Sequence, residues 1–278
     1  MTNFVKMHGC GNDYIYFDCF EQDIKNPETL AVTLCNRNKS IGGDGIVLIL
    51  PSQAADAKMR MYNADGSEAS MCGNSIRCVA KYLFDGGLVT KPNITVETSS
   101  GIKELTLVID KNAIVAVTVN MGKVILEPEK IPVNLTGAII VARQVLVADS
   151  PFEITCVRMG NPHAIIFHDD IEHFDLYSVG TMFENSDLFP EGINLGIVEI
   201  VTRNHLRMRV WERGTGETMA SGTGACAAAV ASVLMGYADK NSDIRVGVTG
   251  GTLMINYTDE AVYMTGGCET AYKGMIQI

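Results

Sequence analysis

Short runs rich in Val, Ile and Leu recur along most of the chain, and this pattern predicts many β-strands. The clearest strands are expected at residues 46–50, 94–97, 105–109, 114–119, 164–167, 197–201 and 206–211. Helices are fewer and are expected at residues 27–37, 74–84 and 223–235. The last two are apolar on almost every side, which is typical of a buried helix. The pattern therefore predicts many short strands arranged around two buried helices.

One stretch of the chain occurs twice at a constant offset. The two copies read MRMYNADGSEASMCGN at residues 59–74 and MRVWERGTGETMASGT at residues 208–223. At this offset Cys72 falls on Ser221. Two further matches follow in the same order, Asn12 with Asn161 and, with a small shift, residues 43–49 with residues 193–200. Several matches in one order indicate an internal duplication.

The duplication predicts two pseudo-symmetric α/β (α+β) domains, and 278 residues suffice for two domains of roughly 150 residues each. We expect one domain at residues 1–120 plus 268–278, which holds Cys72. The other is expected at residues 121–267 and holds Ser221. In each domain the sheet should wrap a helix, and the active site is expected in the cleft between the two.

Composition narrows the class of protein. The formal net charge of −10 argues against a nucleic-acid surface or a basic membrane-binding face. No apolar run approaches the ~18 residues of a membrane span, and the polar start of the chain is unlike a signal peptide. None of the eight cysteines forms a C-x-x-C pair, so we expect no metal site and reduced thiols in the cytoplasm. No phosphate-binding or dinucleotide loop is present, which predicts no cofactor.

Each copy of the repeat ends in a glycine-containing turn that opens a helix, Cys72-Gly73-Asn74 in one and Ser221-Gly222-Thr223 in the other. The free N–H groups of a helix N-terminus hold a carboxylate, and glycine lets a ligand approach the backbone closely. A thiol at this position is readily ionised. One such group can take an α-proton from an amino acid while a second returns it on the opposite face. The repeat therefore favours a two-base racemase or epimerase.

The chain resembles the diaminopimelate epimerase family over nearly its whole length. The resemblance is carried by KMHGCGNDY, NADGSEASMCGNSIRC, RMGNPHA, FPEGINLGIVEI, WERGTGETMASGTGACAAA and MTGGCETAYKGMI. It implies two similar domains, each a mostly antiparallel strand barrel around a central helix. It also implies interconversion of LL- and meso-2,6-diaminopimelate for lysine and peptidoglycan precursors, in the cytoplasm and without pyridoxal phosphate. The implied partner is this small amino acid, and a homodimer is the implied assembly.

The resemblance also assigns residues. Cys72 matches one catalytic cysteine, and Ser221 stands where the family has its second. His163 and Glu212 match the polar partners of the two thiols. The implied cradle of the reacting carboxylate is Gly73, Asn74, Gly222 and Thr223. Further implied substrate contacts are Asn12, Asn63, Asn161, Asn194, Glu212 and Arg213, the last for the distal carboxylate.

Ser221 departs from the family, because a hydroxyl is a far weaker acid than a thiol. We hypothesise that it cripples catalysis, either through an engineered Cys→Ser change or through natural divergence to a non-catalytic amino-acid-binding homologue. A racemase of the same fold for another amino acid, such as histidine, is a further alternative. Smaller departures are Gly45, where some members carry a substrate-contacting Gln, and Ser75-Ile76, where Gly-Ala is more usual.

Overall fold

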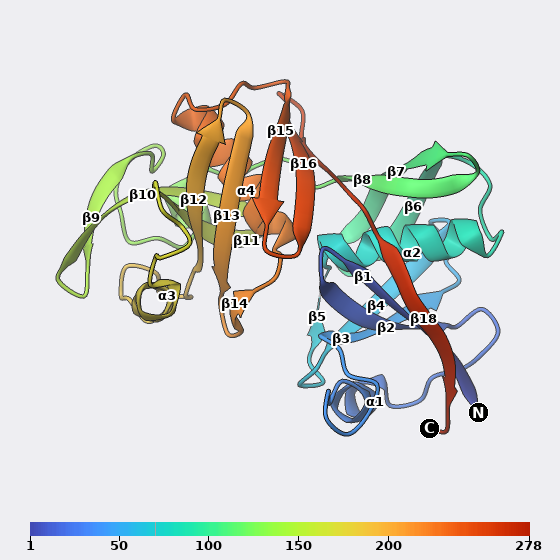
Figure 1. Cartoon of the computed structure of the whole chain (residues 1–278). Helices are drawn as coiled ribbons and strands as arrows, with labels where there is room; N and C mark the ends of the chain where they lie inside the picture. Colours follow the sequence, from blue (N-terminus) through green and yellow to red (C-terminus); the bar gives the residue numbers. More distant parts are fainter. Residues whose placement is uncertain (70) are drawn as a thin grey trace. The chain divides into compact units, whose positions relative to one another are not determined.

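The computed structural model describes residues 1–69 and 71–278, which form a strand-rich α+β fold with few helices (Figure 1). The chain divides into two compact units. Unit 1 comprises Met1–Asn120 and Thr265–Ile278, and unit 2 comprises Met121–Met264. Of the described residues, no helix combines the length and apolar character needed to cross a membrane.

In the sheet of unit 1, the first strand of the chain pairs with the last. Its elements are β1 (Thr2–Gly9), β2 (Asn12–Asp18), α1 (Pro27–Leu34), β3 (Gly45–Leu50), β4 (Ala57–Asn63), β5 (Glu68–Ala69), α2 (Gly73–Asp85), β6 (Asn93–Thr98), β7 (Gly101–Asp110), β8 (Ala113–Asn120) and β18 (Glu269–Ile276). Strand β18 runs antiparallel to β1, as Figure 1 shows, and β1 runs antiparallel to β2. Strands β2 and β3 are parallel, β3 and β4 antiparallel, and β4 and β6 parallel.

Unit 2 repeats this arrangement. Its elements are the short 3-10 helix η1 (Pro128–Lys130), β9 (Arg143–Val147), β10 (Ser150–Met159), β11 (Asn161–Phe167), α3 (Leu176–Glu184), β12 (Asn194–Thr202), β13 (His205–Glu212), β14 (Gly216–Thr218), α4 (Gly222–Leu234), β15 (Asp243–Val248) and β16 (Gly251–Tyr257). Strand β17 (Val262–Gly266) spans the limit between the units. The pairs β10–β11, β11–β12, β12–β13 and β13–β15 have the same directions as β1–β2, β2–β3, β3–β4 and β4–β6.

The strand register shows which single residues of the two units are equivalent. Tyr14 on β2 lies opposite Gly45 on β3, and His163 on β11 lies opposite Asn194 on β12. Both pairs keep the offset that relates Cys72 to Ser221. The shift expected between residues 43–49 and 193–200 is therefore wrong, because these strands align without one.

The two longest helices are the central helices of their units. Helix α4 packs against β10, β11, β12, β13, β15 and β16, and small side chains at residues 225–229 let the strands approach it. Helix α2 packs against β1, β2, β7 and β8. Both helices begin within one residue of the predicted start. Because these buried helices are closely packed against the strands, the N-terminus of each helix is held in place within its unit.

The predicted strands are all present, whereas one predicted helix was too long. Helix α1 ends at Leu34, not at residue 37. The Leu34 carbonyl accepts from the N–H of Gly42 at 2.9 Å, and Gly42 takes the left-handed φ of 77° that glycine tolerates. The Asn36 side chain accepts from the following N–H groups of Asn38 and Lys39, which holds the chain in a turn.

Candidate active site

The two helix starts have the same backbone geometry. Cys72 precedes α2 with φ −131° and ψ 124°, and Ser221 precedes α4 with φ −118° and ψ 115°. Each residue is thus an extended N-cap, whose side chain lies beside the first free N–H groups of its helix. The Ser221 Oγ accepts from the N–H of Gly224 at 3.3 Å. The equivalent positions of the repeat therefore present a thiol in unit 1 and a hydroxyl in unit 2.

The thiol of Cys72 lies against an amide. Its Sγ donates to Oδ1 of Asn12 at 3.3 Å, and Nδ2 of Asn74 donates to the same oxygen at 3.3 Å. Nδ2 of Asn12 in turn donates to Oδ2 of Asp44 at 2.7 Å. Unit 1 thus brings together three of the predicted residues, Cys72, Asn12 and Asn74.

A phenol borders the same thiol. Tyr14 is 5% exposed, and burial raises the pKa of its hydroxyl well above the usual value, with the proximity of Cys72 and of the Asp44 carboxylate adding to the effect. The hydroxyl therefore stays protonated. Tyr14 occupies the position on β2 that His163 occupies on β11. The two halves of the duplication consequently place different chemistry at equivalent sites.

The hydroxyl of Ser221 lies against a carboxylate. Its Oγ donates to Oε2 of Glu212 at 2.9 Å, and Oε1 of Glu212 accepts from the hydroxyl of Thr218 at 2.6 Å. Glu212 ends β13 and Thr218 ends the paired strand β14, so the sheet fixes both side chains. A carboxylate held in this way can take a proton from the group at position 221.

His163 is fully buried and stays neutral near pH 7. Burial lowers its pKa to about 3, and the positive charge of Arg213 contributes. The ring Nε2 lies 3.0 Å from Oδ1 of Asn161. Because that oxygen can only accept, Nε2 carries the hydrogen and Nδ1 carries the lone pair. Within the part of the chain that the structure describes, this Nδ1 has no hydrogen-bond partner, so its lone pair is available to accept a hydrogen bond.

Asn194 and Arg213 are joined to each other. Nδ2 of Asn194 donates to the Pro162 carbonyl at 2.7 Å, and its Oδ1 accepts from the N–H of Arg213 at 3.0 Å. The Arg213 guanidinium donates to the carbonyl of Glu191. Asn194 is 4% exposed, so its hydrogen bonds hold the backbone that carries Arg213.

The remaining predicted residues lie at turns and helix starts. Asn63 ends β4, and its Nδ2 donates to Oγ of Ser67 at 3.0 Å. Gly73 and Gly222 are the first residues of α2 and α4 and are buried. Thr223 follows Gly222 in the first turn of α4 and is partly exposed. The four cradle positions thus fall on the first residues of the two helices.

The smaller departures from the family have local causes. A Cβ on Gly45 would lie 2.3 Å from the carbonyl oxygen of Tyr62 and 2.8 Å from the Tyr14 ring, so no side chain fits there without a shift. Ser75 is buried, and its hydroxyl donates to the Cys72 carbonyl at 3.0 Å. Ile76 is likewise fully buried, so α2 accommodates both larger side chains.

Sequence reasoning missed three side chains at these sites: Tyr14, Asp44 and Thr218. A comparison of the two copies could have found Thr218, because the equivalent residue is the apolar Ala69. No spacing in the sequence signals that Asp44 contacts Asn12, since the contact depends on the loop before β3.

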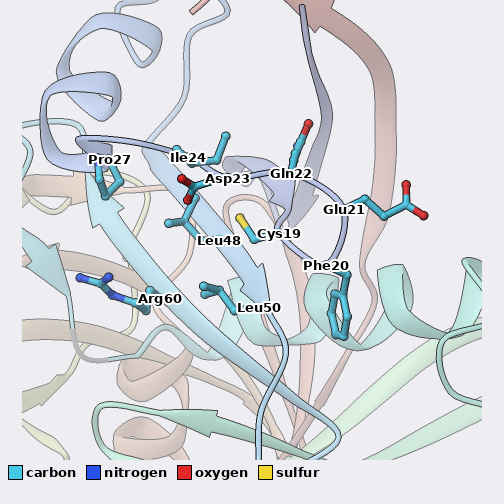
Figure 2. Close-up of a pocket in the computed structure, with 10 residues that line it drawn as sticks. All are labelled: Cys19, Phe20, Glu21, Gln22, Asp23, Ile24, Pro27, Leu48, Leu50 and Arg60. Atoms are coloured by element: carbon cyan, nitrogen blue, oxygen red, sulfur yellow. The ribbon is translucent and has the colours of Figure 1, made fainter.

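A surface hollow of about 400 Å³ in unit 1, shown in Figure 2, has a separate lining. Its side chains come from the segment after β2, from the first residue of α1 and from β3 and β4. They are Cys19, Phe20, Glu21, Gln22, Asp23, Ile24, Pro27, Leu48, Leu50 and Arg60. None of these belongs to the predicted site residues.

Comparison of the sequence with known proteins identifies its relatives. The chain is 48% identical to diaminopimelate epimerase from Acetivibrio thermocellus, covering 99% of this chain and 98% of that protein. It is 46% identical to diaminopimelate epimerase from Methanococcus maripaludis strain S2, covering 99% of each chain.

Solved structures share the fold at low sequence identity. A phenazine biosynthesis protein of the PhzF family from Bacillus anthracis matches with a TM-score of 0.73 at 14% identity, over 100% of this chain and 99% of that one. A hydroxyproline epimerase from Agrobacterium vitis matches with a TM-score of 0.71 at 14% identity, over 98% and 91% of the chains. The family model described as diaminopimelate epimerase matches residues 4–127 and 155–270. On this match and on the identity to its relatives, the chain belongs to the diaminopimelate epimerase family.

Proposed function

We propose that this chain is built to interconvert LL- and meso-diaminopimelate by a two-base mechanism without a cofactor, in cytoplasmic lysine and peptidoglycan precursor synthesis. The observation that carries the proposal is the pair of equivalent helix starts, one with a Cys72 thiol on Asn12 and one with a Ser221 hydroxyl on Glu212. The names of the relatives supply the substrate. A homodimer stays a prediction.

The reaction needs negative charge to be stabilised beside the α-carbon. When a base removes the α-hydrogen as a proton, the electron pair of the C–H bond spreads into the neighbouring carboxylate. The N-terminus of each central helix, α2 in unit 1 and α4 in unit 2, offers partial positive charge and free N–H groups that can stabilise such a carboxylate. An acid on the opposite face then gives its proton to the carbon, and the configuration inverts.

The partners of the two acid–base groups would set their protonation. Glu212 accepts the proton of the group at position 221, and Thr218 holds this carboxylate in place. Neutral His163 offers its Nδ1 lone pair as a further acceptor. Arg213, whose backbone is held by Asn194, supplies a planar donor for the distal carboxylate.

Ser221 is proposed to disable one of the two bases. A hydroxyl on a carboxylate is a much poorer proton donor and acceptor than a thiol in the neutral pH range. Once Cys72 has lost its proton, proton transfer on its face remains available, so this chain should exchange an α-hydrogen without completing the inversion. In this chain the hydroxyls of Ser221 and Thr218 both donate to Glu212, so its carboxylate is hydrogen-bonded on both oxygens.

Restoring the thiol with Ser221→Cys tests the proposal. We expect interconversion of LL- and meso-diaminopimelate to rise by roughly 10²–10⁴-fold, the usual worth of a positioned acid–base group. Isomer ratios by chiral chromatography and α-deuteration by mass spectrometry in deuterated water give the readout. Ser232→Cys, on the buried side of the same helix, is the matched control and should gain no interconversion.

A non-catalytic amino-acid-binding protein is the second candidate, and the satisfied hydroxyl of Ser221 is the observation that favours it. Calorimetric titration with diaminopimelate separates the two. Binding to both forms without deuteration or interconversion by the Ser221→Cys variant supports the binding protein and rejects the epimerase. Activity in that variant rejects the binding protein.

A further inference from the structure

Asp44 fixes which way the Asn12 amide points. Its Oδ2 accepts from Nδ2 of Asn12 at 2.7 Å and from the N–H of Asp13 at 3.0 Å, and its Oδ1 accepts from Arg37 at 2.9 Å. A carboxylate can only accept hydrogen bonds, so the amide nitrogen of Asn12 must face Asp44. The amide oxygen must then face the opposite way.

That opposite side is occupied by Cys72. Oδ1 of Asn12 receives the thiol at 3.3 Å and Nδ2 of Asn74 at 3.3 Å. An amide oxygen attracts the hydrogen of a thiol and repels the negative charge of a thiolate. In this arrangement Cys72 is the hydrogen donor and Asn12 Oδ1 the acceptor, so the thiol carries the hydrogen. If the Asn12 amide turned over, its Nδ2 would favour the thiolate instead.

Asp44 is itself held from several directions. Its backbone N–H donates to the Asp13 carbonyl at 2.8 Å, and its carbonyl accepts from the N–H of Ala64 at 3.1 Å. Arg37 donates to Asp13 at 2.6 Å as well as to Asp44, and Lys6 pairs with Asp13 at 2.5 Å. The carboxylate is thus a fixed part of unit 1.

Unit 2 lacks this device. The position equivalent to Asp44 is Ile193, a fully buried apolar residue that directly precedes Asn194. The acceptor beside the group at position 221 is the carboxylate of Glu212, not an amide oxygen. The two halves thus offer a neutral acceptor to one group and a charged acceptor to the other.

We propose that Asp44 is a positioning residue that turns the Asn12 oxygen toward Cys72 and so keeps Cys72 protonated in the free protein. The proposal deepens the proposed function. Cys72 is then the group that first gives a proton to substrate, while the group at position 221, on Glu212, is the one that first takes a proton. The asymmetry decides which face of the α-carbon the resting protein is ready to protonate.

The other titratable groups facing Cys72 are Tyr14 and Tyr16 on β2 and Cys78 on α2. The variants that test the proposal leave all three unchanged. The variants therefore compare Asp44 with Asn12, and the Asn12 change also removes its hydrogen bond to the Tyr14 hydroxyl.

The test is the pH profile of alkylation at Cys72. Iodoacetamide reacts with the thiolate, and mass spectrometry of the peptide that contains Cys72 separates it from the other cysteines. We expect Asp44→Asn to lower the midpoint by about one pH unit, which is roughly tenfold faster alkylation below both midpoints. Asn12→Ala, which removes the acceptor oxygen, should also lower the midpoint. Asp65→Asn, in an exposed turn of the same unit, is the matched control and should change nothing.

The double variant separates positioning from simple charge. If Asp44 acts through Asn12, adding Asp44→Asn to Asn12→Ala gives no further shift. An equal shift in both backgrounds means that Asp44 acts by its charge alone and overturns the proposal. An unchanged midpoint in Asn12→Ala also overturns it, whether or not Asp44→Asn folds. The readout uses no substrate, so it is independent of whether Ser221→Cys restores turnover.

Discussion

The buried imidazole of His163 makes the stability of the fold depend on pH. Its pKa is lowered to about 3 in the folded chain, against 6.5 for a free imidazole. Below pH 6.5 the His163 imidazole binds a proton in the unfolded chain but not in the folded chain, so acidification favours unfolding. The contribution of His163 to the free energy of unfolding is fully present above pH 6.5 and is lost as the pH falls toward 3.

The expected loss is at most about 1.4 kcal/mol per pH unit between pH 6 and pH 4. Urea unfolding at several pH values measures it. His163→Gln should flatten this part of the profile, whereas His173→Gln, at an 87% exposed ring paired with Asp170, should leave it unchanged. A profile equally steep in His163→Gln would assign the acid sensitivity to other groups.

At this scale the sequence predicts residues that lie in motifs and misses those that depend on tertiary contacts. Cys72 and Ser221 could be predicted as helix N-caps, because a glycine-containing turn precedes an apolar run. The orientation of Asn12 could not, because it depends on a carboxylate brought by a loop that follows α1.

Among the elements, the strand pairs before the two central helices carry the same ion pair with different surroundings. Arg60 on β4 makes two hydrogen bonds to Glu68 on β5, at 2.8 and 3.0 Å. Arg209 on β13 does the same to Glu217 on β14, at 2.8 and 2.9 Å. Arg209 also donates to the carbonyl of Ile171 at 2.7 Å, which joins the segment before α3 to the sheet.

We therefore expect Arg209→Met to destabilise the fold by about 1–3 kcal/mol, because it leaves a part-buried carbonyl without its donor. Arg60→Met should cost no more than about 1 kcal/mol, since its partner is exposed. Urea unfolding of both variants, with hydrogen exchange on α3, gives the comparison. Equal losses of unfolding free energy in the two variants would show that the hydrogen bond from Arg209 to the Ile171 carbonyl does not contribute to stability.

Helix α3 shows why some elements escape prediction. Gly180 lies in its middle, and glycine inside a helical pattern weakens the signal. A Cβ at Gly180 would lie 2.5 Å from the Trp211 ring, so close packing against β13 requires the glycine. The starts of α2 and α4 could be placed to within a residue because their glycines lie in the first turn and the apolar patterns that follow are uninterrupted.

For the whole molecule, the main organising feature is the return of the chain to unit 1. Strand β18 pairs with β1, and Gly274 lies opposite Phe4. A Cβ on Gly274 would approach the Phe4 ring to 2.6 Å, and that ring is only 7% exposed. The glycine thus lets the aromatic ring cover the strand pair that ties the two ends of the chain together.

Gly274→Val should push β18 away from β1 and cost about 1–3 kcal/mol through overpacking. Hydrogen exchange should accelerate on β1 while α4 in unit 2 keeps its protection. Ala271→Val, at an exposed position of the same strand, is the control and should have little effect. Uniform acceleration in both units would mean that the two units unfold together.

Internal repetition made the pairing of the halves predictable from Cys72 and Ser221, whereas the details of each half follow from side chains that the copies do not share. Tyr14 against His163 and Asp44 against Ile193 are examples. A difference between the two copies shows at which position their chemistry diverges. What the side chain at that position contacts depends on the residues that surround it in the folded structure.

The return of β18 also has a consequence for how the protein is made. The ribosome releases β1 first, yet the strand that covers its edge is translated after every other element of both units. Unit 2, which is continuous in the chain, can complete its sheet while unit 1 still has an open edge. The half that is synthesised first is therefore finished last, and a nascent chain stalled before Thr265 carries an uncovered β1, the kind of edge that recruits chaperones or other chains.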